Sequence, residues 1–183
     1  MTPLKLRQAA QILKSGGIVA CPTEAVYGLS CDPLQQPAVE RLLAIKNRDV
    51  GKGLILVASS IEQIPSFVTL PGIRRAAILQ SWPGPSTWLL PAGAAAPAWI
   101  RGEHDSIAMR ITAHPLMAAL CEAFGNCLVS TSANISGLPP AKSALQVQQQ
   151  FGKQIGLILD AETGASPNPT TIRDAITGRT IRG

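Results

Sequence analysis

Residues 54–58 of this chain, Leu-Ile-Leu-Val-Ala, form an unbroken apolar run that strongly restricts the possible folds. A strand without polar positions is buried on both faces, so it lies in a sheet with other layers on each side. Predicted helices at residues 3–15, 37–45, 115–124 and 143–151 alternate with further predicted strands. The sequence therefore predicts an α/β (α+β layered) fold, with a twisted mixed β-sheet flanked by helices in a single domain over residues 1–183.

Charge is sparse in this sequence, and its balance is basic. Only 15% of the residues are charged and 46% are hydrophobic, which is typical of a globular protein rather than a disordered one. Lys and Arg number 16 against 11 Asp and Glu, so the formal net charge is +5. This excess suits a polyanionic partner or substrate, such as nucleic acid or a nucleotide, but composition does not choose between them.

The four cysteines predict reduced, mostly buried thiols rather than a metal site. Cys21, Cys31, Cys121 and Cys127 show no C-x-x-C spacing and have no nearby histidine partner. The N-terminus lacks the apolar segment of a signal peptide, and no apolar run approaches the ~18 residues of a membrane span. We therefore expect a soluble, cytoplasmic protein with no membrane contact and no metal held by its own side chains.

Polar side chains follow several predicted strands at the points where the strands end. The strand at residues 127–129 leads into Ser-Thr-Ser-Ala-Asn-Ile-Ser-Gly at residues 130–137, which predicts a loop of hydroxyls and one amide. Thr23 follows a strand at residues 18–21, and a further strand at residues 170–174 exposes hydroxyls and a cation. Taken alone, the stretch at residues 129–137 suits a polar turn as well as it suits a binding site.

Three cations after the second predicted helix complement these neutral donors. Lys46, Arg48 and Lys52 lie within seven residues, and glycines on both sides of Lys52 let the backbone approach a ligand closely. Alternatively, Lys46 and Arg48 only offset the dipole of the helix that they follow.

A fourth cation, Arg110, belongs to a predicted strand at residues 106–111 whose side chains alternate between two faces. Arg110 shares its face with Ser106 and Ala108, whereas the three large apolar residues point the other way. An arginine in the middle of a sheet is costly unless it is paired or liganded. The sequence leaves both a salt bridge and a ligand open.

The residue types at the strand ends suit phosphoryl or nucleotidyl transfer better than hydrolysis. His104 and His114 lie outside these strand ends, and Glu24 is the only carboxylate of the motif after the first strand. This inventory argues against a catalytic triad or a pair of catalytic carboxylates. Transfer to or from phosphate depends mainly on positioning and on neutralising charge, which a concave cationic face with neutral donors can provide.

Six motifs occur in order along nearly the whole chain: Pro-Thr-Glu-Ala-Val-Tyr-Gly-Leu at residues 22–29, Lys-Asn-Arg at 46–48, Trp-Pro-Gly-Pro-Ser-Thr at 82–87, Arg110, Ser-Thr-Ser-Ala-Asn-Ile-Ser-Gly at 130–137, and Pro-Thr-Thr-Ile-Arg-Asp at 169–174. This series resembles the YrdC-like threonylcarbamoyl-AMP (threonylcarbamoyl-adenylate) synthases in their single-domain bacterial form. The resemblance implies a YrdC-like fold and a nucleotidyltransferase that uses L-threonine, bicarbonate and ATP to give threonylcarbamoyl-AMP and pyrophosphate.

The resemblance also implies cofactors and partners. Mg²⁺ would accompany the triphosphate of ATP, held mainly by phosphate oxygens and water. Downstream proteins would transfer the threonylcarbamoyl group to adenosine 37 of tRNAs that read codons beginning with A, which completes the t6A modification. Direct contact of this chain with tRNA or another RNA would be compatible with its positive charge.

The resemblance assigns roles to individual residues. The K-x-R and S-x-N signatures, which would face the ATP phosphates and the reacting carboxylate as catalytic residues, fall on Lys46, Arg48, Ser132 and Asn134. Lys52 and Arg173 would add further contacts to ATP. Threonine would be held by Thr23, Arg110, Ser130 and Thr171, with the guanidinium of Arg110 pairing in a fork with the threonine carboxylate.

The sequence departs from the family's pattern at three positions. Asp49 stands where proline is frequent, Ala25 replaces a common threonine, and Arg173 occupies a usually apolar position. These departures leave the contacts of Lys52 and Arg173 undefined. The net charge of +5 also supports a second hypothesis, a protein that binds double-stranded RNA, tRNA or rRNA in RNA maturation or translation, although few aromatic residues are available for base stacking.

Overall fold

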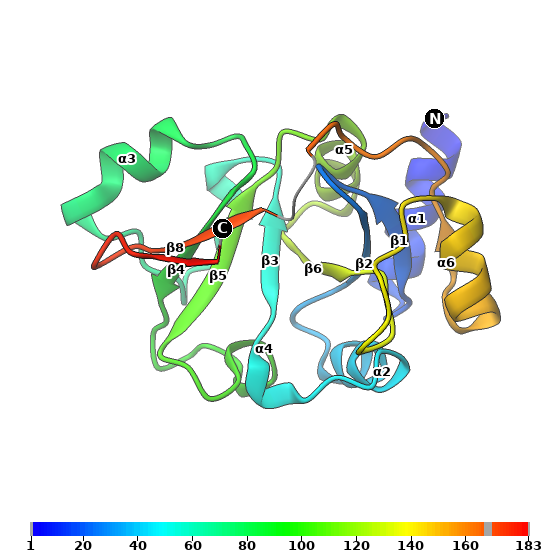
Figure 1. Cartoon of the computed structure of the whole chain (residues 1–183), viewed down its shortest axis with the longest axis horizontal. Helices are drawn as coiled ribbons and strands as arrows, with labels where there is room; N and C mark the ends of the chain where they lie inside the picture. Colours follow the sequence, from blue (N-terminus) through cyan, green and yellow to red (C-terminus); the bar gives the residue numbers. More distant parts are fainter. Residues whose placement is uncertain (1, 167–169, 183) are drawn as a thin grey trace.

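The computed structural model describes residues 2–166 and 170–182, so Pro169 of the last motif lies outside the described residues. Nine strands form one mixed sheet in the order β7 (Leu157–Ile158), β1 (Val19–Pro22), β2 (Tyr27–Cys31), β6 (Leu128–Ser132), β3 (Ile55–Ala58), β5 (Ser106–Ile111), β4 (Ser86–Pro91), β8 (Thr171–Asp174) and β9 (Thr180–Arg182) (Figure 1). The apolar run forms β3 at the centre of this sheet, as burial on both faces requires. The predicted layered fold with a mixed sheet is therefore confirmed.

Helices flank the sheet, and most begin and end where the sequence predicts. Within the described residues they are α1 (Pro3–Lys14), α2 (Gln36–Ile45), α3 (Arg75–Gln80), α4 (Ala98–Arg101), α5 (Pro115–Phe124) and α6 (Ala144–Phe151). Thr2 caps α1 by accepting a hydrogen bond from the backbone N–H of Lys5 at 3.4 Å. Gly125, with φ of 93°, ends α5 in the left-handed conformation that glycine adopts readily. The short helix α4 was not predicted.

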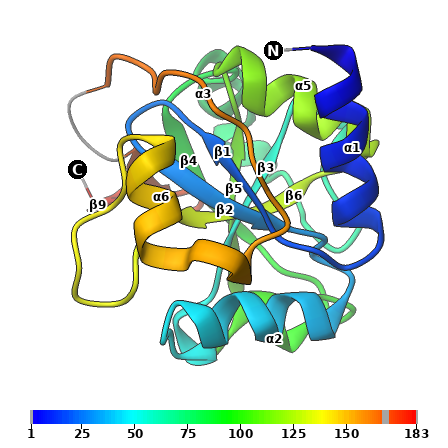
Figure 2. The same ribbon diagram turned by 90° about the vertical axis from the view of Figure 1, so that its right-hand side faces the viewer.

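Two hydrophobic cores lie on opposite faces of the sheet. Helices α1 and α5 pack on one face, where the buried residues include Leu13, Leu120, Val57 and Leu128. The other core lies on the opposite face and includes residues of α2, α3, α4 and α6, among them Leu42, Ile78, Ile100 and Val147. Figure 2 shows α1 and α6 on opposite sides of β1 and β2.

The pairing of β2 with β6 corrects two predictions. The sequence did not predict β2, and it ended the strand at residues 127–129, whereas β6 continues to Ser132. The two strands pair antiparallel, with Gly28 opposite Ser132 and Ser30 opposite Ser130. Backbone groups make this ladder, so small polar side chains weaken the strand signal in the sequence without preventing the pairing. The predicted loop of hydroxyls therefore begins inside the sheet.

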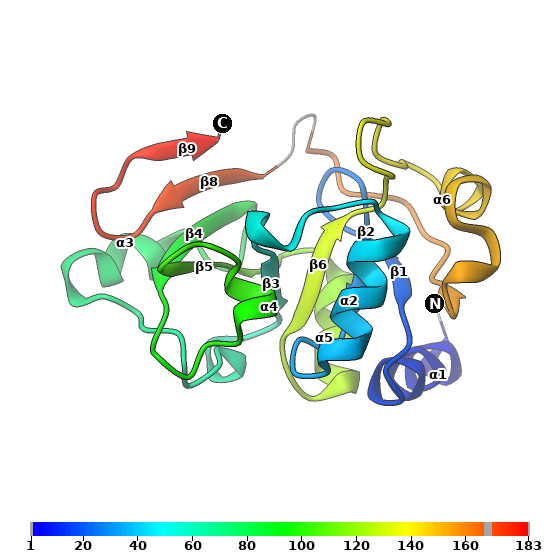
Figure 3. The same ribbon diagram turned by 90° about the horizontal axis from the view of Figure 1, so that it is seen from below.

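Two segments flank the central strands and position the candidate site. Figure 3 shows the β8–β9 hairpin towards one side of the molecule and the loop between β6 and α6 towards the other. The loop is tied to the end of α2, because the N–H of Ser136 donates to the carbonyl of Lys46 at 2.8 Å. The hairpin is tied to the segment before it, because Arg182 Nη2 donates to the carbonyl of Thr170 at 3.1 Å.

Candidate functional site

Two adjoining cavities lie between the β8–β9 hairpin and the loop after β6. The first cavity has a volume of about 270 Å³ and the second about 240 Å³, and both are lined by Arg48, Leu54, Ile55 and Arg182. The first cavity is also lined by Thr23, Ala25, Val26, Tyr27, Gly28, Arg110, Ser130, Thr131, Ser132, Pro140 and Thr170. Within the residues that the structure describes, no Asp or Glu lines either cavity. The space is therefore surrounded by cations and neutral donors.

The face of β5 that carries Ser106, Ala108 and Arg110 contributes to both cavities, as its alternation predicts. Ser106 and Ala108 line the second cavity and Arg110 lines the first. The residues between them, Ile107 and Met109, are buried in the core on the opposite face. The alternation in the sequence therefore predicted correctly which side chains of β5 share the face that lines the cavities.

Arg110 both lines the first cavity and forms an ion pair. Its side chain is buried, its Nη1 donates to Thr170 Oγ1 at 2.9 Å, and its Nη2 lies 3.3 Å from Glu24 Oε2. Burial lowers the pKa of Arg110, and the charge of Glu24 acts in the opposite direction. Of the two alternatives that the sequence left open, the salt bridge is present, and the place of Arg110 in the cavity wall leaves a ligand contact as a prediction.

A left-handed residue separates the two cations of the K-x-R motif. Asn47 has φ of 48°, and the N–H of Arg48 donates to the carbonyl of Leu43 at 3.0 Å, which is how helices commonly end. The turn directs Lys46 and Arg48 to different places. Arg48 lines both cavities, and its Nη2 donates to the carbonyl of Gly53 at 3.0 Å. Burial lowers the pKa of Arg48, and nearby Arg182 lowers it further.

Lys46 lies behind the cavity wall rather than on it. Its ammonium is buried and donates to the carbonyl of Asn134 at 2.7 Å and to the carbonyl of Ser132. Burial lowers the pKa of Lys46 to about 8, and the neighbouring charge of Arg48 acts in the same direction. Lys46 therefore holds the S-x-N loop in place and puts a positive charge close behind it.

The S-x-N motif forms its own hydrogen-bonded turn. Ser132 Oγ donates to Asn134 Oδ1 at 2.6 Å, and Asn134 Nδ2 donates to the carbonyl of Leu138 at 2.9 Å. Only Ser132 lines the first cavity, whereas Asn134 supports it from behind. Thr23 and Ser130, two predicted threonine contacts, are buried and also line this cavity.

Lys52 is exposed and lines the second cavity from a short 3₁₀ turn, Val50–Lys52. Asp49 begins this turn by accepting from the N–H of Gly51 at 2.9 Å, which gives the unusual aspartate after K-x-R a local role. Gly102, at the end of α4, packs directly on the turn: a Cβ there would lie 2.5 Å from the carbonyl oxygen of Gly51.

We expect Gly102→Ala to destabilise the protein by roughly 2 kcal/mol or more, because Gly102 combines φ of 64° with this close approach. Urea unfolding measures the effect. Gly125→Ala is the matched control, because Gly125 has φ of 93° but nothing within 4 Å of the added Cβ. An equal loss in both variants would show that the contact with the cation-bearing turn contributes nothing.

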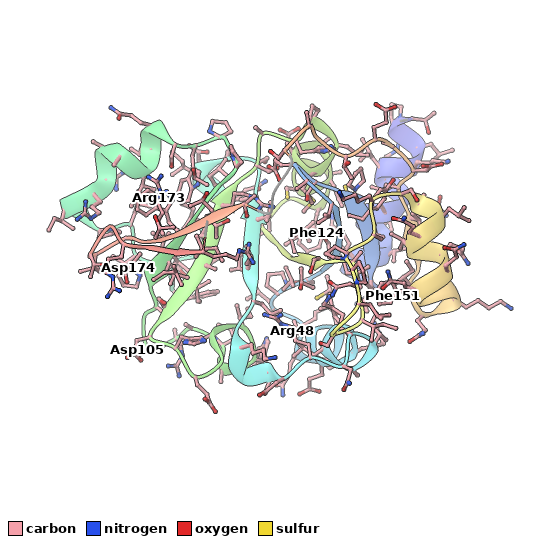
Figure 4. The ribbon with its side chains drawn as sticks, in the orientation of Figure 1. Arg48, Asp105, Phe124, Phe151, Arg173 and Asp174 are labelled. Atoms are coloured by element: carbon pink, nitrogen blue, oxygen red, sulfur yellow. The ribbon has the colours of Figure 1, made fainter. Side chains whose placement is uncertain are left out.

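The C-terminal segment contributes residues other than the predicted ones. Thr171 pairs with Ser86 in the sheet and does not line either cavity, whereas the adjacent Thr170 lines the first. Arg173 is exposed and lies over the ring of Trp88, 6.0 Å from its centroid, and Arg182 lines both cavities in its place. Figure 4 shows Arg48 beside β3 and Arg173 apart from it, on the side of α3.

Other groups lie apart from this site. A third cavity, of about 290 Å³, is lined by Lys14, Asp32 and Cys127 among others and contains none of the predicted site residues. The four cysteines are buried and unpaired, and burial raises the pKa of the Cys121 thiol to about 12. In the described parts of the chain, no three His, Cys, Asp or Glu residues are grouped as metal ligands, and no helix has the length and apolarity to cross a membrane.

Comparison with known proteins identifies the family. The family model for Sua5, YciO and YrdC proteins, described as "Telomere recombination", matches residues 11–182. The chain belongs to this family. The resemblance predicted from the six motifs is thus confirmed.

Curated relatives are similar to this Sua5/YciO/YrdC member over nearly their whole length. A protein named threonylcarbamoyl-AMP synthase from Xanthomonas euvesicatoria pv. vesicatoria (strain 85-10) is 51% identical over 182 residues, which cover 98% of this chain and 97% of the relative. A protein of the same name from Alkalilimnicola ehrlichii (strain ATCC BAA-1101 / DSM 17681 / MLHE-1) is 52% identical over 97% of this chain and 95% of the relative.

Solved structures of the family share the fold. The crystal structure of P. abyssi Sua5 complexed with L-threonine has a TM-score of 0.88 and 34% identity over 95% of this chain. This chain spans about half of that protein, because the match covers 52% of it. E. coli YciO has a TM-score of 0.84 at 23% identity, covers 100% of this chain and 92% of that one, and supports the fold alone.

Sequence reasoning missed three residues that this family member brings to the site. Thr170 stands next to the predicted Thr171, so the P-T-T motif signalled the segment but not which hydroxyl faces the cavity. Arg182 carried no signal, because no motif surrounds it and only the β8–β9 hairpin brings it to the cavities. Glu24 was noted as the lone carboxylate of its motif, but its pairing with Arg110 spans distant parts of the chain.

Proposed function

We propose that this chain is a threonylcarbamoyl-AMP synthase, an enzyme that joins L-threonine, bicarbonate and ATP and releases pyrophosphate. The observation that carries the proposal is the pair of adjoining cavities, which share Arg48 and Arg182 and have no carboxylate among their described lining residues. Carboxylate and phosphate oxygens of the substrates suit such a lining, because guanidinium groups bind both strongly. Relatives of that name, 51% and 52% identical over nearly the whole chain, support the same assignment.

Threonine occupies the first cavity in this proposal. Arg110 pairs with the threonine carboxylate, using the part of its guanidinium that faces the cavity. The hydroxyls of Thr23, Ser130 and Thr170 supply neutral partners for the amino and hydroxyl groups of the substrate. Thr170, rather than the predicted Thr171, takes part in this contact.

ATP occupies the second cavity, with its triphosphate at the junction of the two cavities. Arg48 and Arg182 line both cavities and neutralise phosphate charge, Ser132 contributes a hydroxyl, and Lys52 lines the second cavity. Mg²⁺ arrives with ATP as part of the substrate. The described cavity residues do not suit Mg²⁺ ligation, because they include no carboxylate, so phosphate oxygens and water hold the ion.

The chemistry requires two bond-forming steps, and the chain's contribution is mainly positioning. First, the amino nitrogen of threonine bonds to the carbon of bicarbonate, water leaves, and a carbamate forms. A carbamate oxygen then attacks the α-phosphorus of ATP, and the bond from that phosphorus to pyrophosphate breaks. Arg48 and Arg182 stand where the two substrates meet and offset the charge on the phosphate oxygens, as phosphoryl-group chemistry requires.

The product is an activated acyl-type adenylate, so a second protein must consume it. We infer that partner proteins transfer the threonylcarbamoyl group to tRNA, as the family resemblance implies. The RNA-binding alternative gains no support from the named relatives, although contact with tRNA during transfer is compatible with the charge of +5.

Release of pyrophosphate from Mg–ATP tests the proposal. We expect release that depends on both L-threonine and bicarbonate, with threonylcarbamoyl-AMP identified by its mass. Serine, which lacks the methyl group of threonine, and valine, which lacks its hydroxyl group, serve as substrate controls. No threonine-dependent pyrophosphate from folded protein would overturn the assignment.

The lowered pKa of Lys46 predicts an alkaline loss of activity. Lys46 is charged below its folded-state pKa of about 8 and loses that charge as the pH rises through this value. Because kcat/KM reports ionisations of the free enzyme, we expect kcat/KM for ATP to fall above about pH 8. Lys46→Arg retains its charge and should remove this inflection. A wild-type profile that is flat to pH 9.5 would contradict the prediction.

Stability should change in the opposite sense over the same interval. The folded-state pKa of Lys46 lies below its ordinary value of 10.5, so between about 8 and 10.5 unfolding takes up a proton at this residue. The contribution of Lys46 to the free energy of unfolding therefore rises with pH in this window. Urea unfolding of the wild type and of Lys46→Arg separates this effect from the loss of activity.

A further inference from the structure

Among the described residues, Glu24 is the only carboxylate that pairs with a cation of the first cavity, yet it does not line either cavity. It lies behind Arg110, with Glu24 Oε2 at 3.3 Å from Arg110 Nη2. Both side chains are buried, with exposed fractions of 8% for Glu24 and 6% for Arg110. Glu24 therefore cannot contact a substrate directly, but it contacts the group that we assign to the threonine carboxylate.

Two of the three nitrogens of the Arg110 guanidinium contact other side chains, Nη1 through a hydrogen bond and Nη2 through an ion pair in which Glu24 Oε2 has no hydrogen-bond partner among the described residues. Nη1 donates to Thr170 Oγ1 at 2.9 Å and Nη2 lies against Glu24, whereas Nε is buried without a hydrogen-bond partner among the described residues. A buried N–H without a partner is costly and is usually satisfied by some acceptor. The orientation of the guanidinium, and hence which N–H groups a ligand meets, depends on these two supports.

Glu24 is itself fixed from behind by Thr112. The Thr112 hydroxyl donates to Glu24 Oε1 at 2.6 Å and accepts from the backbone N–H of His114 at 3.1 Å. Because a carboxylate oxygen only accepts, the Thr112 hydroxyl donates its own hydrogen to Glu24 while its oxygen accepts from His114. Thr112, like Glu24, is buried and lines neither cavity.

The backbone of Glu24 is also clamped. Its carbonyl accepts from the N–H of Ser166 at 3.0 Å, and Gly164 lies so close that a Cβ there would be 2.6 Å from the Glu24 carbonyl oxygen. Glu24 is thus immobilised through its backbone and through one carboxylate oxygen, and its other oxygen is left for Arg110. Neutralising the charge of Arg110 would not require these contacts. They also fix the orientation of the Glu24 carboxylate relative to Arg110.

We propose that Glu24, oriented by Thr112, is a positioning residue that presents Arg110 to the threonine carboxylate. This inference rests on the proposed function of the first cavity and deepens it. Arginine has a long, flexible stem, and a fork recognises a carboxylate only when both N–H groups are aimed at it. The contacts from Thr112 to Glu24 and from Glu24 to Arg110 orient the guanidinium for the threonine carboxylate. They involve no residue that we assign to ATP binding.

Glu24→Gln tests this proposal with little change in shape. The glutamine oxygen can still accept from Thr112, but its NH₂ group then faces Arg110 Nη2, donor against donor. We expect the KM for threonine to rise about tenfold or more, while the KM for ATP changes less than about twofold. Glu24→Asp, which retains the carboxylate, should recover part of the lost threonine affinity.

Thr112 provides a second test that leaves the ion pair in place. Thr112→Val removes only the orienting hydroxyl and should raise the KM for threonine, whereas Thr112→Ser keeps the hydroxyl and should restore most of the wild-type value. Because Thr112 acts through Glu24, the double variant with Glu24→Gln should be no worse than Glu24→Gln alone. Glu40→Gln, an exposed carboxylate on α2, is the control for loss of charge.

The outcomes separate this inference from the function on which it rests. An active wild type in which Glu24→Gln and Thr112→Val raise the threonine and ATP KM values equally, or only lower the melting temperature, would overturn the role of Glu24 alone. Additive effects in the double variant would likewise contradict a role of Thr112 through Glu24. A wild type without threonine-dependent pyrophosphate release would overturn the synthase assignment and this role together.

Discussion

Replacing Lys46 by alanine is expected to reduce kcat/KM for ATP about 100-fold or more. The ammonium is buried, donates to the carbonyls of Ser132 and Asn134, and brings its charge close behind the cavity wall. Loss of one preorganised electrostatic group from such a site commonly costs ~10²–10³ in rate. Two carbonyls also lose their donor, so we expect a loss of roughly 1–3 kcal/mol in the free energy of unfolding.

Steady-state kinetics and urea unfolding on the same preparation separate these effects. Lys153→Ala, an exposed lysine near α6, is the matched control and should retain wild-type kinetics. Lys46→Arg retains the charge and should keep most of the ATP affinity, with a stability cost from the larger head group. A folded Lys46→Ala protein with a normal rate would show that the charge behind the S-x-N loop has no part in the reaction.

Arg110→Ala is expected to raise the KM for threonine by ~30-fold or more while changing the KM for ATP much less. A charge-assisted fork to a carboxylate contributes on the order of 2 kcal/mol, which corresponds to this factor. Removing Arg110 also leaves Glu24 without the cation that it faces at 3.3 Å. Breaking a buried pair on one side typically costs about 3–5 kcal/mol, so a lower melting temperature should accompany the kinetic change.

Threonine binding measured by calorimetry on the folded fraction isolates the first effect from the second. Arg110→Lys keeps a positive charge but loses the planar fork, so it should be intermediate in threonine affinity. Arg75→Ala, an exposed arginine on α3, should behave as the wild type. Equal losses of threonine and ATP affinity in Arg110→Ala would contradict the placement of threonine at this residue.

Two kinds of feature could be predicted from the sequence: strands with a clear hydrophobic pattern and helices with a clear capping residue at one end. The apolar run gave the central strand, and the alternation at residues 106–111 placed Ser106, Ala108 and Arg110 on the wall of the cavities. Thr2 and Gly125 mark helix ends with groups whose preference for those positions is local. Local chemistry determines these features, so one sequence suffices to find them.

Features that depend on distant partners could not be predicted in the same way. Strand β2 is recognisable only through its ladders with β1 and β6, because Gly28 and Ser30 have low intrinsic preference for strands. Arg182 lies at the cavities because β9 pairs with β8, and no local motif in the sequence predicts this hairpin. The choice between Thr170 and Thr171 depends on where β8 begins, and helix and strand boundaries are the least certain part of a prediction.

The candidate site shows the same division. The motifs located segments that meet at one cavity, because Arg48, Ser132, Thr23, Ser130 and Arg110 all line the first cavity. Which member of each motif lines the cavity and which supports the lining residue from behind was not visible in the sequence. Lys46 and Asn134 are in the supporting position, and this distinction follows from burial and hydrogen bonding rather than from spacing.

Asn47 has a left-handed backbone conformation and separates the two cations of the K-x-R motif. The placement of these cations therefore depends on having one residue between them and less on which side chain that residue carries. The backbone reverses its hand there, so Lys46 still belongs to the end of a helix while Arg48 already belongs to the cavity. Glycine at position 47 would keep this geometry, since it adopts positive φ at least as easily as asparagine. Deletion of Asn47 would instead join Lys46 directly to Arg48 and remove the turn that directs them to different places. This short segment should therefore tolerate exchange of its middle residue far better than its loss.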